Sequence, residues 1–314
     1  MATMSVLVLG GYGAVGTHLM SLLRAAETPA LTAGRNATRA DRVVDLSDIG
    51  SFEAALDSVT AVVNCAGAED IRLAETCAGR GIPFLDISAT TDYVAALEKI
   101  GGPVVLGVGL APGLTTLLAV DVLSAQPGPV DILIGLGAGE HHGPAATAWT
   151  YGLLGQHFPD PDGTAVRNFT KPARFDVPAQ SGYRSGRALR ADFADQHRLT
   201  REFGVPVRAY LRTDSRIGTA GLALLTRAPA LRSLIPPRMP GSDRWILLAR
   251  ATDGSARWAY GRGQSKATAV VTAATVHAVL NHHPTDPTWI HQLLTLADVR
   301  DTLHDNEIEL GDRR

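Results

Sequence analysis

Residues 5–16 read SVLVLGGYGAVG and place the pattern G-x-G-x-x-G directly behind an apolar run. The run at 6–9 predicts a buried strand, and residues 14–26 carry apolar side chains at helical spacing. In such a strand–turn–helix context the first glycine permits the tight turn, the second lets the backbone approach a diphosphate, and the third lets the helix pack on the strand. The residues predicted to form this phosphate cradle are Gly11, Tyr12, Gly13, Ala14, Val15 and Gly16.

Short apolar runs keep alternating with helical patterns as far as residue 113. The predicted strands are 6–9, 29–33, 43–44, 59–63, 83–86 and 104–106. This alternation is typical of an α/β protein with a doubly wound parallel sheet of the Rossmann type. The alternative, a glycine turn in an α/β domain that binds no nucleotide, is less favoured because six units follow in register.

The end of the second predicted strand bears on the cofactor. Sites for NAD usually carry Asp or Glu there to hold the ribose 2′-hydroxyl, whereas this chain has Arg35 followed by Asn36. An arginine can contact a 2′-phosphate with two donors and stack on adenine, which favours NADP(H) over NAD(H). The alternative is an arginine on a surface loop. Further cofactor contacts are expected from Asp45 and Leu46 beside the adenine, and from Ala66 and Gly67 along the ribose.

Composition indicates an ordinary globular protein of about two domains. Of 314 residues, 45% are hydrophobic and 19% charged, and the net charge is −2. Two cysteines, Cys65 and Cys77, form no disulfide or metal-binding pattern. The chain shows no signal sequence and no apolar run of about 20 residues. We therefore expect a cytoplasmic protein that binds neither nucleic acid nor membrane.

Charge is divided unevenly between the two halves. Residues 1–150 hold 7 basic and 15 acidic residues (7 − 15 = −8), and residues 151–314 hold 22 and 16 (22 − 16 = +6). A basic second half can attract an anionic substrate. The alternative is a solvated, arginine-rich surface.

The segments GGYGAVG, AGRN, VVNCAG, PFLDIS and GVGLAPGL, in this order, resemble the saccharopine dehydrogenase-like family of NADP-binding oxidoreductases. GEHHGPAATAWT and GRGQSKATAVVTA are similar to the second domain of that family, whereas residues 160–240 carry few matching motifs. The resemblance implies a homodimer and hydride transfer to or from a C=N or C=O carbon. It also implies that residues 109–113 lie near the nicotinamide, and so assigns Gly109, Pro112 and Gly113 to the cofactor site.

The second half predicts an α+β substrate domain on a mostly antiparallel sheet. Its predicted elements are strands at 129–136 and 206–211, a helix at 145–157, and a hairpin of 245–251 with 255–260. The predicted domains are 1–124 for the nucleotide and 125–264 for substrate and dimerisation, with a helix at about 265–281 that returns to the first domain. Residues 282–314 are expected to form a helical tail, with helices around 289–296 and 297–303 and a short strand at 308–310.

Candidate chemistry lies in the second domain. His142, on the loop 137–143, is predicted to donate a proton or hydrogen bond to the substrate; the alternative is an exposed loop histidine. No metal site is expected, because the adjacent Glu140 and His141 complete no ligand set. The predicted substrate-binding residues are Trp149, Tyr151, Tyr183, Arg184 and Gln264. For Trp149 and Tyr151, which project from the predicted helix, the alternative of core packing is the more common one.

The chain carries three lysines, Lys99, Lys171 and Lys266, and none forms the Ser-x-x-x-Tyr-x-x-x-Lys relay of short-chain dehydrogenases. We therefore expect an NADPH-dependent oxidoreductase that acts on a small, amino-acid-like and carboxylated substrate. Two alternatives remain open: an NADP-binding sensor or scaffold without turnover, and a ketone or alkene reductase of secondary metabolism.

Overall fold

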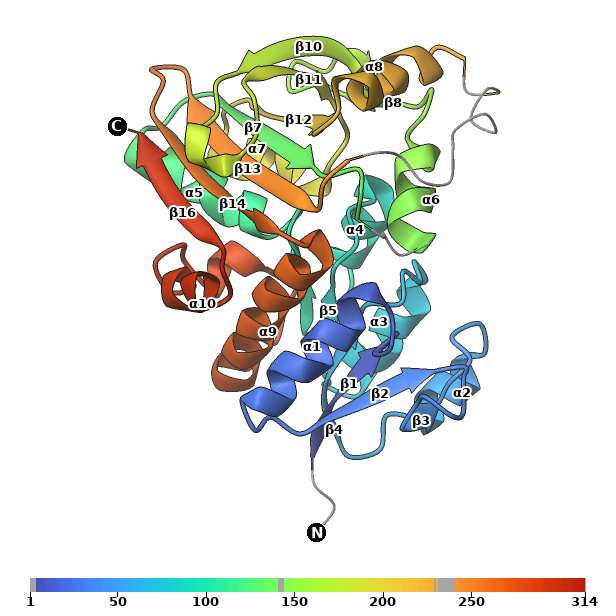
Figure 1. The fold of residues 1–314 in the computed structure, drawn as a ribbon. Coiled ribbons are helices and arrows are strands. Elements are labelled where there is room, and N and C mark those ends of the chain that lie inside the picture. Colours follow the sequence, from blue (N-terminus) through green and yellow to red (C-terminus); the bar gives the residue numbers. More distant parts are fainter. Residues whose placement is uncertain (1–3, 141–143, 229, 231–240, 314) are drawn as a thin grey trace.

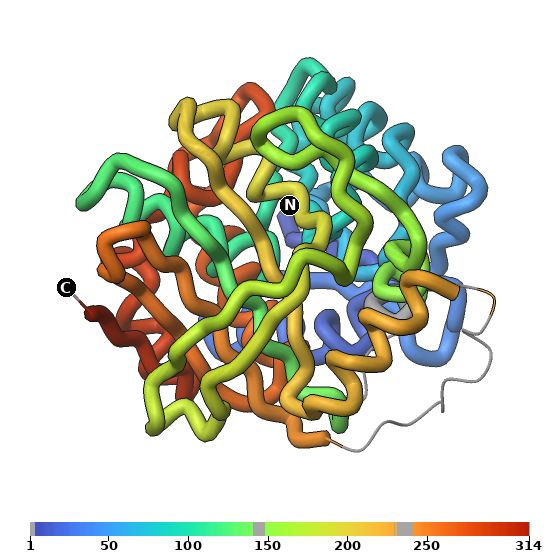
Figure 2. Tube along the Cα trace, turned by 90° about the horizontal axis from the view of Figure 1, so that it is seen from above, coloured from blue at the N-terminus to red at the C-terminus, as the bar shows by residue number. Residues whose placement is uncertain are grey.

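The computed structural model describes residues 4–140, 144–228, 230 and 241–313, without the side chains of 144–147. Two seven-stranded sheets lie one above the other, each with its own helices (Figure 1). The first sheet and the helices that cover it are called the nucleotide unit below. Seen from above, the green, yellow and orange segments of the second sheet lie over the blue part of this unit (Figure 2).

The first sheet has the strand order β15-β6-β5-β4-β1-β2-β3, and all its pairs are parallel. This confirms the predicted doubly wound fold. Its strands are β1 (Ser5–Leu9), β2 (Ala30–Gly34), β3 (Arg42–Val43), β4 (Val59–Asn64), β5 (Phe84–Asp86), β6 (Val104–Leu106) and β15 (Thr288–Trp289).

Successive side chains of β1 point to opposite faces of the sheet, and this explains why helices cover both faces. Val6 and Val8 pack with Leu19 of α1, whereas Leu7 and Leu9 pack on the opposite side with Phe52 of α2. One face is covered by α1 (Ala14–Ala25) and α9 (Gln264–His282), and the other by α2 (Ile49–Ala54), α3 (Ile71–Gly79) and α4 (Thr91–Leu97).

The second sheet has the order β10-β11-β12-β7-β13-β14-β16 and is antiparallel except for the pair β12–β7. Its strands are β7 (Val130–Leu136), β10 (Thr170–Phe175), β11 (Gly186–Arg190), β12 (Val207–Thr213), β13 (Arg244–Ala251), β14 (Ala256–Arg262) and β16 (Glu309–Arg313). The inner face packs on α5 (Leu114–Ala125) and α7 (Ala194–Phe203). The outer face carries a separate apolar cluster that includes Leu133, Tyr183 and Tyr210.

Several elements differ from the sequence prediction. The helix predicted at 145–157 is α6 (Pro144–Gly152), which ends before the short hairpin of β8 (His157–Pro159) and β9 (Ala165–Arg167). The prediction had also missed α8 (Arg216–Leu225).

The expectation of a helix around 289–296 is wrong. Those residues form β15 and a 3₁₀ turn, Ile290–Gln292, and the later helix is α10 (Arg300–Asp305). Residues 282–314 thus supply one strand to each sheet, because each sheet ends in an edge strand that an extended segment can cover. Within the described chain, no helix is both long and apolar enough to cross a bilayer.

Candidate active site at the strand ends of the nucleotide unit

The glycine turn after β1 has the shape of a phosphate cradle. Gly13 is the N-cap of α1, and its N–H is already used in a turn, donating to Gly10 O at 2.8 Å. The N–H groups of Ala14 and Val15 have no backbone acceptor in the described chain, so they are the donors left for an anion at the helix N-terminus. Gly13 belongs to the predicted cradle, but the turn occupies its N–H, so this group is not available to an anion.

The glycines differ in what they permit. A Cβ on Gly16 would stand 2.2 Å from Gly10 O, and one on Gly11 would stand 2.8 Å from Thr32 Cγ2, so both residues allow backbone elements to touch. A Cβ on Gly13 would meet only Gly10 O, at 3.1 Å, and Gly13 is exposed. Gly13 is therefore the position where a side chain would obstruct a ligand more than the fold.

The end of β2 is cationic. Arg35 and Asn36 are exposed there, and Arg39 lies 4.7 Å above the Tyr12 ring and donates to Tyr12 O at 3.0 Å. The Tyr12 hydroxyl in turn accepts from Asn36 N–H at 3.1 Å. The structure thus joins the predicted Tyr12, Arg35 and Asn36 and adds Arg39, which the sequence analysis had not selected although it follows Arg35 by four residues.

The first acidic residue after β2 in the sequence, Asp41, is bound to the strand itself. Both Thr32 N–H and Thr32 Oγ1 donate to Asp41 Oδ2, at 2.8 and 2.7 Å, and these bonds hold the pKa of Asp41 below its ordinary value. Asp41 therefore fastens the loop back onto β2.

Asp45 and Leu46 follow β3. One oxygen of the exposed Asp45 accepts from Ser47 Oγ and N–H, at 2.7 and 3.0 Å, and these bonds lower the pKa of Asp45. Leu46 is half-buried against the core on the side of α2. Asp45 is thus ionised and open to solvent, whereas only part of the Leu46 side chain is accessible to a ligand.

A buried polar cluster lies where β4 and β5 end, and the sequence analysis had missed it. Asp86 accepts from Asn64 Nδ2 at 2.7 Å, from the Tyr93 hydroxyl at 3.0 Å and from Ser88 N–H at 2.7 Å. All three members of this polar cluster (Asn64, Asp86 and Tyr93) are buried, and burial raises the pKa of Asp86 above its ordinary value. Asn64 Oδ1 also accepts from Ala66 N–H at 3.2 Å, so the cluster fixes the predicted ribose segment of Ala66 and Gly67.

Glu69 lies at the open side of this cluster. The residue as a whole is exposed, and its Oε1 accepts from Thr90 Oγ1 at 2.6 Å. Partial burial of the carboxyl group raises the pKa of Glu69, and the charge of Asp86 adds to the effect. An accessible carboxyl with a raised pKa at the strand ends is suited to proton transfer. The raised pKa comes from partial burial and the nearby Asp86, whereas the hydrogen bond from Thr90 opposes it, and none of these effects can be read from the sequence.

The loop 109–113, which the resemblance assigns to the cofactor site, is closely packed. Gly109, Pro112 and Gly113 are buried, and a Cβ on Gly113 would stand 1.9 Å from Gly109 O. The loop folds on itself, with Gly109 N–H donating to Pro112 O at 3.0 Å. These three residues therefore form the packed start of α5, which leaves almost no surface of theirs for a cofactor.

The N-terminus of α9, where we had placed Gln264, already holds an anion. Glu140 accepts from Gln264 N–H at 2.5 Å and from Ser265 N–H at 2.9 Å, and Gln264 Nε2 donates to Gly137 O at 3.1 Å. The favourable position for negative charge is thus filled by the chain itself.

The other predicted substrate residues are not brought together. Trp149 packs on Phe193 with 4.9 Å between ring centroids, and it joins Tyr151 in the core on the inner face of the second sheet. Tyr183 belongs to the cluster on the outer face, beside the exposed Arg184. Because a sheet separates the two pairs, they do not line one site. His142 lies outside the described residues, and among those described no group of three or more metal-ligating side chains occurs.

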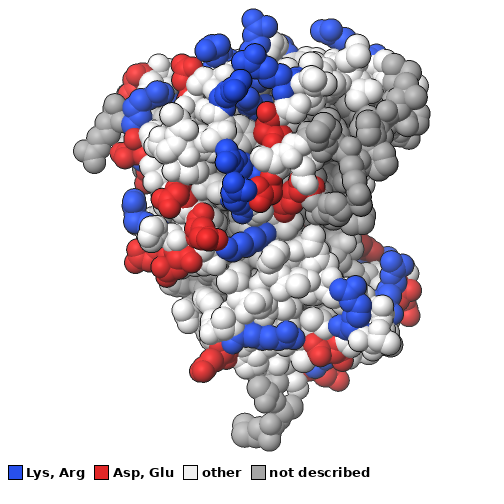
Figure 3. Space-filling view, in the orientation of Figure 1, with Lys and Arg blue, Asp and Glu red and all other residues white. Residues whose placement is uncertain are grey.

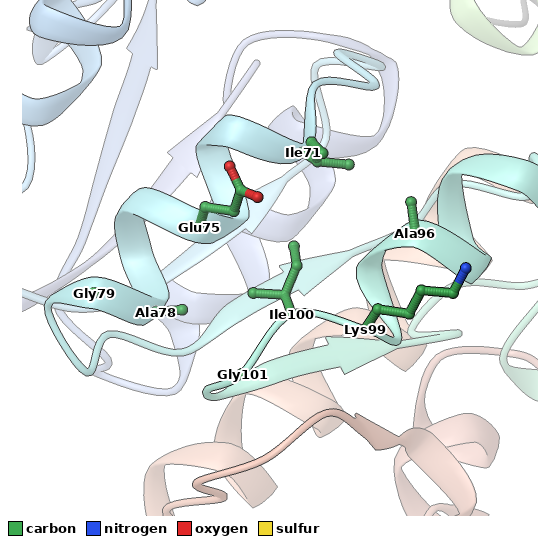
Figure 4. A pocket seen from close by; sticks show the side chains of 8 residues that line it. All are labelled: Ile71, Glu75, Ala78, Gly79, Ala96, Lys99, Ile100 and Gly101. Atoms are coloured by element: carbon green, nitrogen blue, oxygen red, sulfur yellow. The ribbon is translucent and has the colours of Figure 1, made fainter.

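Figure 4 shows a depression of about 580 Å³ between α3 and α4, lined by Glu75 and Lys99 among others. Both of these charged residues are exposed. The depression lies on the flank of the nucleotide unit and shares no residue with the strand-end site.

Comparison with known proteins agrees with a nucleotide fold in the first part of the chain. Residues 6–87 match the sequence profile of the NAD dependent epimerase/dehydratase family. This is less than half of the chain. No curated protein matches the sequence.

Solved structures share the general arrangement at a distance. DAP dehydrogenase of C. glutamicum, in complex with DAP, is 13% identical, covers 96% of this chain and 99% of its own, and has a TM-score of 0.47. Dihydrodipicolinate reductase from Paenisporosarcina sp. TG-14, with dipicolinate bound, is 9% identical, covers 93% and 99%, and has a TM-score of 0.42. What the chain itself shows is a Rossmann-type nucleotide unit with a second, mostly antiparallel domain.

Proposed function

We propose that this protein is an NADP(H)-dependent oxidoreductase that transfers hydride to or from a C=N or C=O carbon of an amino-acid-like substrate. The observation that carries the cofactor choice is the end of β2. It presents Arg35 and Arg39 beside the phosphate cradle, while Asp41 is held by Thr32.

Two guanidinium groups suit a 2′-phosphate. Each can donate two parallel hydrogen bonds to phosphate oxygens, and neither can deprotonate at physiological pH. Tyr12 supports Arg39 from below and offers an aromatic surface at the same point. A site for NAD would instead carry a carboxylate at the end of β2 itself to accept from the 2′-hydroxyl, whereas the free carboxylate nearby, Asp45, follows β3 and is attracted by Arg35.

The bound nicotinamide would supply the hydride, and the chain provides orientation, a proton and exclusion of water. The N–H groups of Ala14 and Val15 hold the diphosphate, and Ala66 and Gly67 border the ribose, fixed by Asn64. Glu69 exchanges a proton with the heteroatom of the reacting carbon, and it is the described residue that we assign to this role; the predicted His142 lies outside the described residues. A protonated imine already carries positive charge, so a single carboxyl is sufficient.

The saccharopine dehydrogenase-like motifs favour imine chemistry, in which an amine condenses with an oxo-acid and the imine is reduced, or the reverse. The uneven charge supports a carboxylated substrate, because the second half of the chain is basic. We also expect the protein to form a homodimer and to act in the cytoplasm.

The decisive experiment has two steps on one sample. The purified protein is titrated with NADPH and with NADH while nicotinamide fluorescence is followed, and a panel of amines and oxo-acids is then added while absorbance reports NADPH oxidation. Tighter binding of NADPH and oxidation with one pair support the proposal. Tighter binding of NADH would overturn the cofactor choice. Binding without turnover across the panel would favour a sensor or scaffold instead.

A further inference from the structure

A second concave site lies on the outer face of the second sheet. It is a pocket of about 350 Å³ whose lining includes Tyr183, Arg184, Arg212, Asp214, Arg216 and Arg244. Tyr210 and Ile246, neighbours of these residues on β12 and β13, belong to the outer-face cluster, opposite α5 and α7. The pocket is therefore separated by the sheet from the helices that join the second domain to the nucleotide unit.

Arg212 is the buried centre of this pocket. It is only 5% exposed, lies 5.8 Å from the centre of the Tyr183 ring and donates through Nη1 to Arg184 O at 2.9 Å. Its Nε, also buried, meets no acceptor in the described part of the chain. Burial lowers the pKa of Arg212, and Arg216 adds to this by repulsion. A buried donor on a cation without a partner is costly, so Arg212 contributes positive charge to the pocket that no acceptor in the described chain offsets at Nε.

The surrounding protein neutralises these cations only in part, because the nearby charge of Asp214 attracts Arg212 and opposes the effect of burial on its pKa. Among the described residues, no carboxylate lies within ion-pair distance of Arg184, Arg212, Arg216 or Arg244. Asp214 is the acidic residue of the lining, and its two oxygens accept from Ala138 N–H at 3.0 Å and Ser242 N–H at 2.5 Å. Figure 3 shows Lys and Arg side chains on the second-sheet half of the molecule, with Asp and Glu side chains among them.

The pocket is also placed at the start of a helix. The ten-residue α8 begins at Arg216, and Ser215 caps it by accepting from Gly218 N–H at 3.2 Å. The positive end of this helix dipole adds to the field of the four guanidinium groups.

We propose that this pocket binds a small, multiply charged oxyanion, a di- or tricarboxylate or a phosphate, at a site separate from the nucleotide cradle. Its volume is at the lower end of the range for small-molecule sites, about 300–1,000 Å³, and so suits a metabolite of a few carbons. Carboxylate and phosphate share the geometry that forked guanidinium groups recognise.

The test is calorimetric titration of the full chain with citrate and with pyrophosphate at constant ionic strength, with and without saturating NADPH. The main variant is the double substitution Arg184→Ala and Arg216→Ala, since both side chains are exposed and their loss spares the core. Arg187→Ala is the matched control, because Arg187 is an exposed arginine of β11 that does not line the pocket. Arg212→Gln probes the buried centre, and thermal melting checks that each variant is folded.

We expect saturable binding of at least one anion, with and without NADPH. The double variant should weaken it by about tenfold or more, as the loss of charge-assisted hydrogen bonds predicts, and Arg187→Ala should leave it unchanged. The proposal is overturned if the wild-type protein binds neither anion, or if the double variant binds both as tightly as wild type. It is also overturned if NADPH abolishes the binding, because the anion would then occupy the nucleotide cradle. If the wild-type protein binds neither anion and is a dimer that the double substitution dissociates, the pocket is a contact between subunits instead.

Discussion

The hydroxyl of Tyr12 lies directly over Gly34: a Cβ on Gly34 would stand 2.4 Å from it. The missing side chain at the last residue of β2 lets the aromatic ring of the glycine turn reach across to the loop that carries Arg35 and Arg39. Tyr12 thereby connects the phosphate cradle to the residues that we assign to the 2′-phosphate, and several predictions concern this connection.

Arg35→Asp should weaken NADPH binding far more than NADH binding. The new carboxylate repels a 2′-phosphate and can accept a hydrogen bond from a 2′-hydroxyl. Fluorescence titration with both nucleotides measures the ratio, and Arg24→Asp on the exposed side of α1 is a charge-matched control. Equal loss of both affinities would contradict the 2′-phosphate assignment.

Gly34→Ala should weaken both nucleotides by a similar factor, because it displaces Tyr12 rather than a charge. The same titration applies, with Gly79→Ala as control, since a Cβ on Gly79 meets no atom within 4 Å. If the variant loses affinity for NADPH but not for NADH, Tyr12 acts only through Arg39.

Gly13→Val and Gly16→Ala should separate binding from folding. Valine at the exposed position 13 should abolish nucleotide binding and leave the protein folded, whereas alanine at 16 forces a Cβ against Gly10 O and should lower the free energy of unfolding by about 3 kcal/mol. Urea unfolding and nucleotide titration of both variants measure this. A Gly13→Val protein that still binds NADPH would place the phosphates elsewhere.

Glu69→Gln should remove one limb of the pH dependence of turnover. If the protonated carboxyl donates to the substrate during reduction, the wild-type rate falls as pH rises through the raised pKa of Glu69. The variant should be slow across the range and lack this fall, with NADPH affinity unchanged. Asp92→Asn, at an exposed acid in the first turn of α4, should keep the wild-type profile. A Glu69→Gln profile that keeps the same fall would exclude Glu69.

The buried ion pair of Arg190 and Asp160 should dominate the stability of the second domain. Its side chains are 2% and 8% exposed, and Arg190 also donates to Gln196 Oε1 at 2.8 Å and to Ala209 O at 2.7 Å. Asp160→Asn leaves the buried cation without its counter-charge, so the free energy of unfolding should fall by about 3 kcal/mol. Asp176→Asn, at an exposed pair with Arg174, should change it by less than about 0.5 kcal/mol. Similar losses in both variants would show that burial of the pair is not what matters.

The sequence by itself determined the nucleotide unit. Alternating apolar strands and helices up to residue 113, with glycines at the first turn, are local patterns that can be recognised in the sequence before the pairing of the strands is known. The hairpin at 245–260 was likewise predictable, because its turn residues and its two strands are contiguous. The cationic end of β2 was also readable as Arg35, next to its strand.

Other features of the fold and of the candidate site depend on contacts between residues that lie far apart in the sequence. Thr288 and Trp289 form a strand because the edge of β6 is open to them. The pKa values of Asp86 and Glu69 are raised because the fold buries these carboxyls, and Asp86 adds to the effect on Glu69. The positions of Tyr183 and Arg184 also depend on tertiary structure, because the sequence predicts that these residues bind the substrate together with Trp149. The face of a sheet to which a side chain points depends on strand register, and register is fixed by pairing with distant strands.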